Sequence, residues 1–400
     1  MKEQLFAYLD TRSQEMNEMA DAIFTHPETA HNEYFASSLL CDFLTKEGFR
    51  VERGLGRQET AFRAEQTLGN GNGPSIGLLC EYDALEGLGH ACGHHMQGPG
   101  ICGTAVALKK ILDNKCNGKI IVYGTPAEES GGGKIILLED GYLKDIDVAL
   151  MLHGSPTTCV DVKSMAAASV TVTFHGKSAH AALKPEAGRS AFDALLLSFN
   201  GLEFLREHVR EDSRIHYTMQ ELPGPANIVP AKAVGAFSVR SYNSVYLHDE
   251  LLPRFCDVMR GAAIMTGTSY EIKTERILEG KVPAYSLNEI VMENARLVGA
   301  PRIRAPREKT GSSDFGNVMY EVPGCCIRIA FVPEGTSSHS QMFLDMGLTE
   351  EAHQAILYAA KILAGTAWDL LSDNEHMETV KNEFRENKAR LKNIVVLPLL

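Results

Sequence analysis

The segment from residue 167 to residue 277 constrains the fold most, because its pattern describes a complete structural unit. Its signals follow the order β-α-β-β-α-β, which predicts a split, ferredoxin-like α+β unit. The strand signal "ASVTVTFHG" alternates apolar and polar residues, and "SAFDALLLSFNGLEFLREHV" repeats apolar residues at helical spacing. A self-contained unit inside a longer chain is typical of an inserted domain with close-set ends. We therefore predict an inserted domain over residues 167–277.

The flanking stretches, residues 1–166 and 278–400, are predicted to form one discontinuous domain. Four hundred residues exceed what one hydrophobic core usually organises. The segments "SIGLLC", "GKIIVYG" and "VALMLHG" have the pattern of buried strands, and "ICGTAVALKKILDN" has that of a helix. Strands joined by helices predict an α/β domain with a mostly parallel sheet and helices on both faces. The charged segment "SDNEHMETVKNEFRENKARLKN" is expected to form a surface helix.

Composition narrows the range of partners and compartments. The formal net charge of -12 argues against a nucleic-acid partner, because phosphate binding needs Lys and Arg on the contact surface. The N-terminus carries charges throughout, and no uncharged apolar run reaches membrane-spanning length, so we expect a cytoplasmic protein without membrane contact. The nine cysteines show no disulfide spacing. Most of them are expected to be small core residues, namely Cys41, Cys80, Cys102, Cys159 and Cys256.

The Gly-rich segment "GLGHACGHHMQGPG" carries a candidate metal-binding pair. Cys92 and His94 are separated by one residue in a loop that precedes a predicted helix. A thiolate beside an imidazole suits a borderline-soft ion such as Zn²⁺ or Mn²⁺. The pair alone also fits a reactive thiol, or a loop whose histidines bond to the backbone.

Four further segments place ligand-type residues at the ends of predicted strands, where α/β sheets carry their active sites. Glu128 and Glu129 follow a strand in "YGTPAEESGGGK", where one carboxylate can bind a metal while the other takes a proton from water. His153 ends the strand in "MLHGSP", and His339 lies in the Ser-rich "EGTSSHSQMF". Asp83 in "CEYDAL" can accept a hydrogen bond from a ligand histidine.

Each of these residues has an ordinary explanation when taken singly. Adjacent glutamates are commonly solvated charges, a strand-end histidine is commonly hydrogen-bonded, and an aspartate after a strand can cap a helix. Five loops with compatible ligand types make a metal site the better explanation. Two other classes remain open at this point: a cysteine-nucleophile hydrolase using Cys92 with His94 or His90, and a non-catalytic metal-binding scaffold.

The motifs resemble those of a known enzyme family. "GHACGH", "TPAEESGGG", "LHGSP", "SAHAA", "PANIVPA" and "SSHSQMF" follow the order found in the aminoacylase and carboxypeptidase G metallopeptidases of clan MH type. The match is closer to their cysteine-containing amidohydrolase branch, which includes hippurate hydrolase. "EYDAL", "GTPAEESGGGK" and "GSSDFG" are similar to the p-aminobenzoyl-glutamate hydrolase and basic-dipeptidase sub-branch. The resemblance covers roughly residues 10 to 370.

The resemblance implies a site with two divalent metal ions per subunit, Zn²⁺ or Mn²⁺, with Co²⁺ also suited to such a mixed site. Cys92 would be the ligand shared by both ions. Glu128 would be the general base, which accepts a proton from metal-activated water. The implied ligands are Cys92, His94, Glu129, His153 and His339.

The resemblance also implies that the flanking stretches form the catalytic domain and that residues 167–277 form a lid or dimerisation domain. It gives roles to residues of this inserted domain. His180 in "GKSAHAA" would reach the active site of a partner subunit in a homodimer and polarise the scissile carbonyl. Asn227 and Arg240 would hold the substrate carboxylate, for which an arginine fork is well suited. Edge strands of the inserted sheet could pair across the two-fold axis.

Two positions depart from the commoner family pattern. His95 stands where Asp or Asn usually follows "CGH", so it would adjust the surroundings of the ligands or compete with them. Ser313 stands where the hippurate-hydrolase pattern has Glu. The loop Gly311, Ser312 and Ser313 is expected to lie near the substrate, so specificity should differ from that of simple acyl-amino-acid hydrolases.

The sequence thus predicts a metal-dependent amidohydrolase, or metallopeptidase, acting on linear amides or peptide bonds. The expected substrate is an N-acyl or N-aroyl amino acid, such as an aminobenzoyl-glutamate-like conjugate. A dipeptidase of the same mechanism, acting on dipeptides with a basic C-terminal residue, is the alternative.

Overall fold

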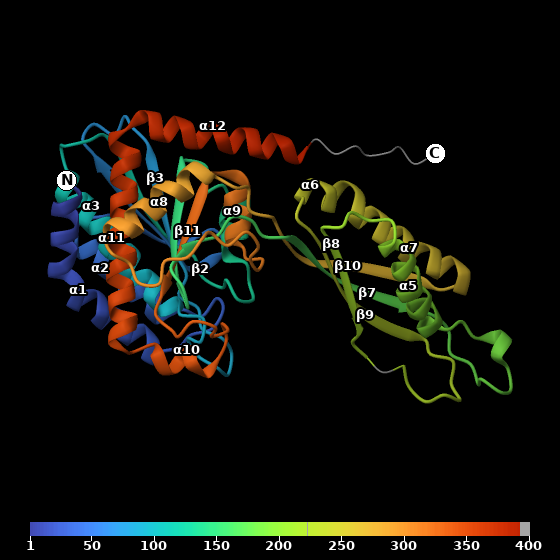
Figure 1. The fold of residues 1–400 in the computed structure, drawn as a ribbon. Coiled ribbons are helices and arrows are strands. Elements are labelled where there is room, and N and C mark those ends of the chain that lie inside the picture. Colours follow the sequence, from blue (N-terminus) through green and yellow to red (C-terminus); the bar gives the residue numbers. More distant parts are fainter. Residues whose placement is uncertain (222, 393–400) are drawn as a thin grey trace. The chain divides into compact units, whose positions relative to one another are not determined.

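The computed structural model describes residues 1–221 and 223–392, and the described chain forms two units (Figure 1). Unit 1 comprises Met1–Lys163 and Lys281–Lys388, and unit 2 comprises Ser164–Gly280 and, within the described chain, residues 389–392. We expected residues 389–392 in the catalytic domain, whereas in the structure they group with unit 2. Among these residues, the Leu391 carbonyl accepts a hydrogen bond of 3.0 Å from Asn243 Nδ2 of unit 2.

The sheet of unit 1 has the strand order β1-β2-β4-β3-β5-β11-β6. Its four central strands, β4, β3, β5 and β11, are parallel, while β1, β2 and β6 pair antiparallel at the flanks. The predicted mostly parallel α/β sheet is therefore confirmed, but the flanking hairpin β1–β2 was not predicted. The strands are β1 (Arg50–Leu55), β2 (Gln58–Leu68), β3 (Ser75–Cys80), β4 (Gly118–Gly124), β5 (Val148–Ser155), β6 (Cys159–Val160) and β11 (Gly324–Ala330).

Helices cover both faces of this sheet, as expected. One face carries α1 (Lys2–Thr25), α2 (Tyr34–Lys46), α3 (Gln97–Leu112), α8 (Tyr285–Leu297) and α11 (Glu350–Ser372). The other face carries the short helices α4 (Gly133–Glu139) and α9 (Phe315–Glu321). The 3-10 turn η1 (His94–Met96), α10 (Gln341–Met346) and α12 (Asn374–Leu391) complete the unit's helical elements among the described residues.

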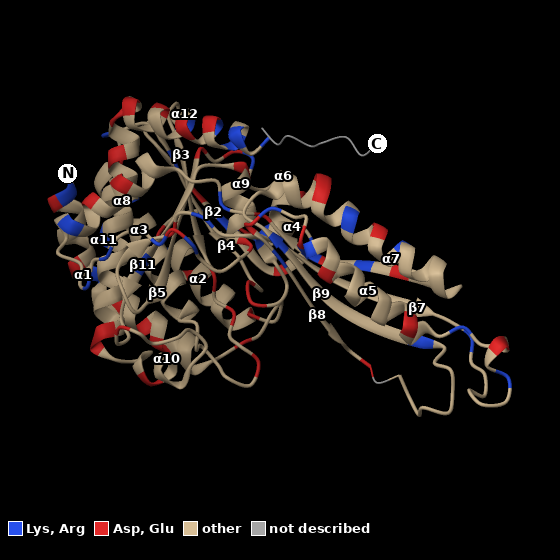
Figure 2. Ribbon diagram, turned by 45° about the vertical axis from the view of Figure 1, so that its right-hand side comes forward, with Lys and Arg blue, Asp and Glu red and all other residues tan. Residues whose placement is uncertain are grey.

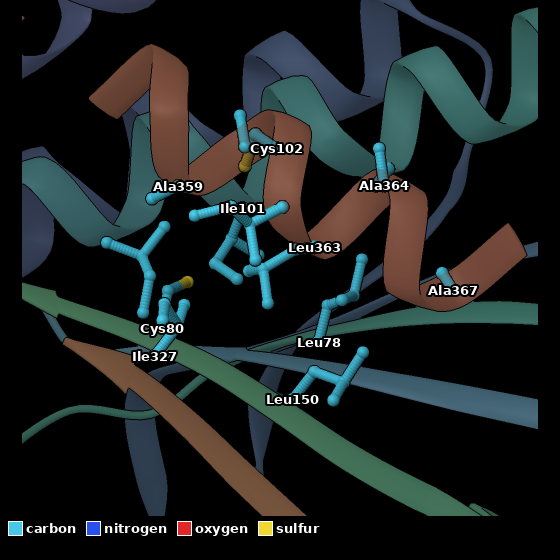
Figure 3. Packing of buried hydrophobic residues seen from close by; sticks show 14 of the residues in the cluster. Leu78, Cys80, Ile101, Cys102, Leu150, Ile327, Ala359, Leu363, Ala364 and Ala367 are labelled. Carbon is cyan, nitrogen blue, oxygen red and sulfur yellow. The ribbon is translucent and has the colours of Figure 1, made fainter. Parts of the chain in front are cut away.

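The main core lies where α3 and α11 pack on the parallel strands (Figure 3). Ile101 of α3 and Leu363 of α11 face Leu78, Leu150 and Ile327 of the sheet, and all five side chains are fully buried. Shortening one such side chain to Ala typically costs about 2–5 kcal/mol, because it leaves a cavity. Of the cysteines expected in cores, four are buried, and Cys256 of unit 2 is half-buried.

Helix α11 is the one helix, within the described chain, that is long and apolar enough to cross a membrane by length and composition. Of its apolar window, 67% is buried inside the structure. Its apolar surface is therefore accounted for by the core of unit 1, as in the central helix of a packed domain.

Unit 2 has the chain order β7-α5-β8-β9-α7-β10, which confirms the predicted β-α-β-β-α-β pattern. Its antiparallel sheet has the order β10-β7-β9-β8, so β8 and β10 are edge strands. Helices α5 and α7 cover one face. The elements are β7 (Ala166–His175), α5 (Ala191–Arg206), β8 (Ser213–Met219), β9 (Lys232–Ser241), α7 (Leu252–Thr266) and β10 (Ser269–Leu278), with short turns η2 (Pro185–Ala187), α6 (Ser244–Tyr246) and η3 (Leu247–Leu251).

The charged C-terminal segment forms the predicted surface helix, α12. Basic and acidic residues alternate along its ribbon (Figure 2). Met377, Val380 and Phe384 are its buried residues, and the first two belong to the main core of unit 1. Their spacing of three and four residues gives the helix one apolar stripe, which explains how so polar a segment is helical.

Candidate metal centre

The predicted ligands of unit 1 come together at the carboxyl ends of the parallel strands. Asp83 follows β3, the Glu128–Glu129 pair follows β4, and His153 lies near the end of β5. Cys92 and His94 lie at the turn η1, and His339 precedes α10. Because parallel strands end at one edge of a sheet, these loops meet there although they are far apart in sequence.

The ligand atoms form two groups of three that share one sulfur. Cys92, His94 and His153 form one group, and Cys92, Glu129 and His339 form the other. Within each group the candidate ligand atoms all lie within 4.8 Å of one another. This is the arrangement expected of two neighbouring ion positions with Cys92 between them, and each position has mixed sulfur, nitrogen or oxygen donors.

The two buried histidines are oriented so that Nε2 of each ring faces the other candidate ligands. Nδ1 of His94 lies 3.0 Å from the Asp83 carbonyl oxygen and 3.1 Å from Asp83 Oδ1. Nδ1 of His153 lies 2.8 Å from the Gly154 carbonyl oxygen. Because these oxygens accept hydrogen bonds, each Nδ1 carries a proton, and Nε2 is the ring nitrogen that would bind a metal. Burial opposes the charge of His94, but Cys92 and Glu81 raise its pKa well above the ordinary value, so a metal would displace a proton from its Nε2. Nε2 of His153 lies 3.5 Å from Cys92 Sγ.

The residues fit a metal by an independent criterion, since two of the proposed donor atoms are buried without a hydrogen bond. Among the described residues, His94 Nε2 and Glu129 Oε1 are such atoms, and they lie 3.9 Å apart. His339 Nε2 lies 3.3 Å from the same Glu129 oxygen. Buried polar atoms are rarely left without a hydrogen bond. Two such atoms that face one another and could bind a metal therefore indicate a place for a cation.

Burial shapes the chemistry of Cys92. It raises the pKa of the Cys92 thiol to about 11, although the neighbouring His94 opposes the rise. A nucleophilic cysteine requires the opposite shift, because the thiolate is the reactive form. The site therefore disfavours the cysteine-nucleophile alternative. A divalent cation favours the thiolate, because a thiol that coordinates a metal loses its proton.

The two other histidines of the Cys92 loop point elsewhere. His95 is fully buried, and its Nε2 lies 2.9 Å from the Gly347 carbonyl oxygen. Its ring packs edge-on against Phe24, with centroids 4.8 Å apart, and His90 stacks with the same ring. His95 therefore does not compete for the ions, and its role is to pack the loop against the N-terminal helix.

The loop that carries Glu128 is held by carboxylates that accept its backbone N–H groups. Ala127 N donates to Glu33 Oε1 at 2.8 Å, and Glu129 N donates to Asp83 Oδ2 at 2.9 Å. Ala127 has a φ of 59°, which is unusual for a residue with a side chain. Backbone in this region persists only where the surroundings fix it, and it is common at functional sites.

Beneath this loop lies a buried ionic cluster that the motifs did not single out. Lys134 Nζ lies 2.7 Å from Glu81 Oε1 and 2.8 Å from Asp314 Oδ1, and all three residues are buried. Burial disfavours the Lys134 charge, but Asp314 and Glu81 keep its pKa above the ordinary value. Burial and the charges of Glu81 and Asp314 raise the pKa of Glu128 well above that of a free carboxyl. Glu81 and Lys134 both lie inside the motifs quoted above, but the motifs gave no sign that their side chains meet. The only sequence signal was that one side chain is acidic and the other basic.

A second ionic cluster surrounds Asp161, after β6. Its carboxylate lies 2.9 Å from Lys281 Nζ, 2.7 Å from an Arg307 nitrogen and 3.1 Å from an Arg328 nitrogen. Arg328 pairs in register with His153 on the neighbouring strand. Burial and the Arg328 charge lower the pKa of His153 well below its ordinary value, which keeps the imidazole neutral and able to bind a metal.

The remaining predicted residues lie in two places. Gly311, Ser312 and Ser313 belong to unit 1 and lead directly into Asp314 of the first cluster. His180, Asn227 and Arg240 belong to unit 2.

Within unit 2, the His180 and Asn227 segments are neighbours. Ala181 N donates to the Asn227 carbonyl at 3.0 Å, and the side chains of His180 and Asn227 are exposed. Arg240 lies on β9, where its Nε donates to Ser238 Oγ at 3.0 Å.

Comparison with known proteins identifies the family. The sequence model of peptidase family M20/M25/M40 matches residues 76–366. A human Xaa-Arg dipeptidase is 32% identical, with 94% of this chain and 90% of that protein aligned. A p-aminobenzoyl-glutamate hydrolase chain of Escherichia coli is 28% identical, with 94% of this chain and 93% of that protein aligned.

Solved structures share the fold. A Bacillus subtilis protein described as a dinuclear metal binding peptidase from the M20 family aligns with a TM-score of 0.69 and 20% identity, over 91% of this chain and 99% of that one. The aminobenzoyl-glutamate utilization protein from Klebsiella pneumoniae aligns with a TM-score of 0.69 and 21% identity, over 92% of this chain and 98% of that one.

Proposed function

The chain belongs to peptidase family M20/M25/M40 and is a hydrolase of amide or peptide bonds, and on this premise we propose that it is a two-metal amidohydrolase that releases a free amino acid. The proposed substrate is an N-acyl or N-aroyl amino acid. The proposed ions are Zn²⁺, Mn²⁺ or Co²⁺, two per subunit. One observation carries the proposal, namely the two ligand groups that share Cys92 beside the carboxylate of Glu128.

The residues of unit 1 divide the work between binding and proton transfer. Cys92, His94 and His153 would hold one ion, and Cys92, Glu129 and His339 the other. The bound ions would polarise the substrate carbonyl and lower the pKa of water. Glu128 would accept the proton of the attacking water and deliver it to the leaving amine. Burial, which raises the pKa of Glu128, suits a group that must both take and return a proton.

Unit 2 would supply the groups that recognise the substrate. Arg240 and Asn227 would bind its carboxylate, with the loop of Gly311–Ser313 beside it. His180 would donate a hydrogen bond to the scissile carbonyl in the partner subunit of a homodimer. The edge strands β8 and β10 of unit 2 support this dimer, because an edge strand can pair with a strand of another chain. A cytoplasmic location is consistent with nine cysteines that are all free.

A dipeptidase acting on dipeptides with a basic C-terminal residue is the second candidate. It is favoured by the likeness to the human Xaa-Arg dipeptidase, which extends over 94% of this chain. The chemistry at the ions would be unchanged, because both substrates present an amide next to a carboxylate-bearing residue. The two candidates differ in the group on the other side of the bond and in the leaving amino acid.

A hydrolysis screen tests the proposal. Chelator-treated protein would be reloaded with Mn²⁺, Zn²⁺ or Co²⁺ and offered hippurate, p-aminobenzoyl-glutamate, N-acetyl amino acids and Xaa-Arg, Xaa-Lys and Xaa-Glu dipeptides. Release of the free amino acid is measured. We expect turnover that requires the metal and disappears in Glu128→Gln. Turnover that survives chelation, or none on any substrate with both ions bound, would refute the proposal.

A further inference from the structure

The Glu128 carboxylate lies close to other acidic side chains. It lies in a group with the carboxylates of Glu81 and Asp314, whose oxygens are all within 4.8 Å of one another. Three carboxylates this close repel one another strongly in a buried site. The position of Glu128 therefore depends on what holds its loop and on what balances its neighbours.

Lys134 both holds the Glu128 loop and balances the charges of Glu81 and Asp314. It lies six residues after Glu128, at the start of α4, and its side chain is fully buried, with 0% of it exposed. Its ammonium contacts Glu81 at 2.7 Å and Asp314 at 2.8 Å. Its backbone N also donates to Asp314 Oδ2 at 3.0 Å. The loop that begins at Glu128 is thus fastened at its far end to two other segments.

These two segments lead to the remaining parts of the site. Glu81 directly follows β3, accepts a hydrogen bond from Gln97 at 2.7 Å, and lies 3.2 Å from His94 Nε2. Asp314 directly follows the Gly311–Ser313 loop. Lys134 therefore connects the base loop, the strand beside the ligand His94 and the predicted substrate loop through one buried charge.

We propose that Lys134 is a positioning residue for the general base, fixing the Glu128 loop to Glu81 and Asp314 without contacting substrate or metal. The inference rests on the proposed function, because it assumes that Glu128 accepts the proton. Without the ammonium, Glu81 and Asp314 lose their shared partner and the loop loses its anchor. A displacement of about 1 Å at a reacting group can cost about a hundredfold in rate.

The first test is Lys134→Met, which keeps the length of the side chain and removes its charge. We expect kcat to fall about a hundredfold, with KM changed by less than about threefold and both ions retained. A crystal structure of the metal-loaded variant should show Glu128 displaced from its present place beside Glu81 and Asp314. Lys2→Met, which removes the remote ion pair to Asp369 (2.7 Å), is the matched control and should leave kcat unchanged.

The second test separates anchoring from charge balance. The double variant Lys134→Met/Asp314→Asn removes one buried cation together with one buried anion, so most of the lost thermal stability should return. The anchor is still missing, so kcat should stay low. If Lys134→Met does not fold, the double variant carries the test by itself.

Several results would overturn the inference. The first is a kcat within about threefold of wild type in a variant that lacks the Lys134 charge. The second is recovery of kcat together with stability in the double variant. The third is a loss of kcat that matches a loss of bound metal. A wild-type enzyme that is active with an unaffected Lys134→Met would refute the inference and leave the proposed function intact. An inactive wild type would refute the proposed function, and the position of Glu128 in the variant's structure would then decide the inference.

Discussion

The substitution Glu33→Gln should remove a loss of stability that the protein undergoes as the pH rises from 5 to 8. The Glu33 side chain is fully buried, accepting hydrogen bonds from Ala127 N at 2.8 Å and Thr60 Oγ1 at 2.9 Å. Burial raises the pKa of Glu33 to about 7 from its ordinary 4.5, although these hydrogen bonds oppose the rise and the charge of Asp83 adds to it. The anchor of the base loop is therefore a carboxyl that ionises near neutral pH.

The sign of the effect follows from proton linkage. A carboxyl with a raised pKa binds its proton more tightly in the folded protein than in the unfolded chain. Its contribution to stability is fully present below about pH 4.5 and is lost as the pH rises through about 7. The shift corresponds to about 3 kcal/mol in total, of which roughly 2–3 kcal/mol is lost between pH 5 and pH 8. Glutamine is neutral throughout and escapes this loss.

The assay is thermal unfolding of chelator-treated wild-type and Glu33→Gln protein from pH 5 to pH 8, so that metal binding does not contribute. The variant's Tm relative to wild type should rise by about 5 °C across this range, given about 2–4 °C per kcal/mol for a domain of this size. Thr60→Val removes one hydrogen bond to the carboxylate and should enlarge the pH-dependent loss. A Tm difference that is constant with pH, or that shrinks towards pH 8, would refute the reasoning.

Three further predictions concern the site and the assembly. Glu128→Gln should lower kcat by about two to four orders of magnitude while both ions remain bound, as elemental analysis will show, and full activity would contradict its role as base. Cys92→Ala should bind neither ion tightly, whereas His153→Ala and His339→Ala should each keep one, because only Cys92 belongs to both ligand groups. The same number of bound ions per chain in all three variants would argue against a shared sulfur. Light scattering should find a homodimer, and a fully active monomer would rule out the role of His180 in a partner's site.

Much of the fold could be predicted from the sequence because its signals are strong. The central strands of unit 1 are short apolar runs buried on both faces, and unit 2 alternates strands and helices of ordinary length. The hairpin β1–β2 escaped prediction because β1, "RVERGL", is mostly exposed and carries no clear apolar alternation. Residues 389–392 group with unit 2 in the structure, and Leu391 bonds there to Asn243, which lies 148 residues earlier and could not be paired with it from the sequence.

Part of the candidate site could likewise be predicted from the sequence, and part could not. Its proposed ligands could be named because thiol, imidazole and carboxylate groups stood at strand ends within recognisable motifs. Lys134 and Asp314 could not be paired, because they are 180 residues apart and a lysine in a Gly-rich loop is usually solvated. Only the folded chain shows that this lysine is buried and what neutralises it. The orientation of His95 away from the ligands likewise depends on a contact with Gly347.

The sulfur of Cys92 has a consequence for how the site would fill. Because both ligand groups contain this atom, the two ions cannot load independently. Burial raises the pKa of the thiol to about 11, so the first ion must displace its proton at neutral pH, and the second meets a sulfur that is already ionised. The thiol proton is released with the first equivalent only. The affinity of the first ion should therefore rise more steeply with pH than that of the second.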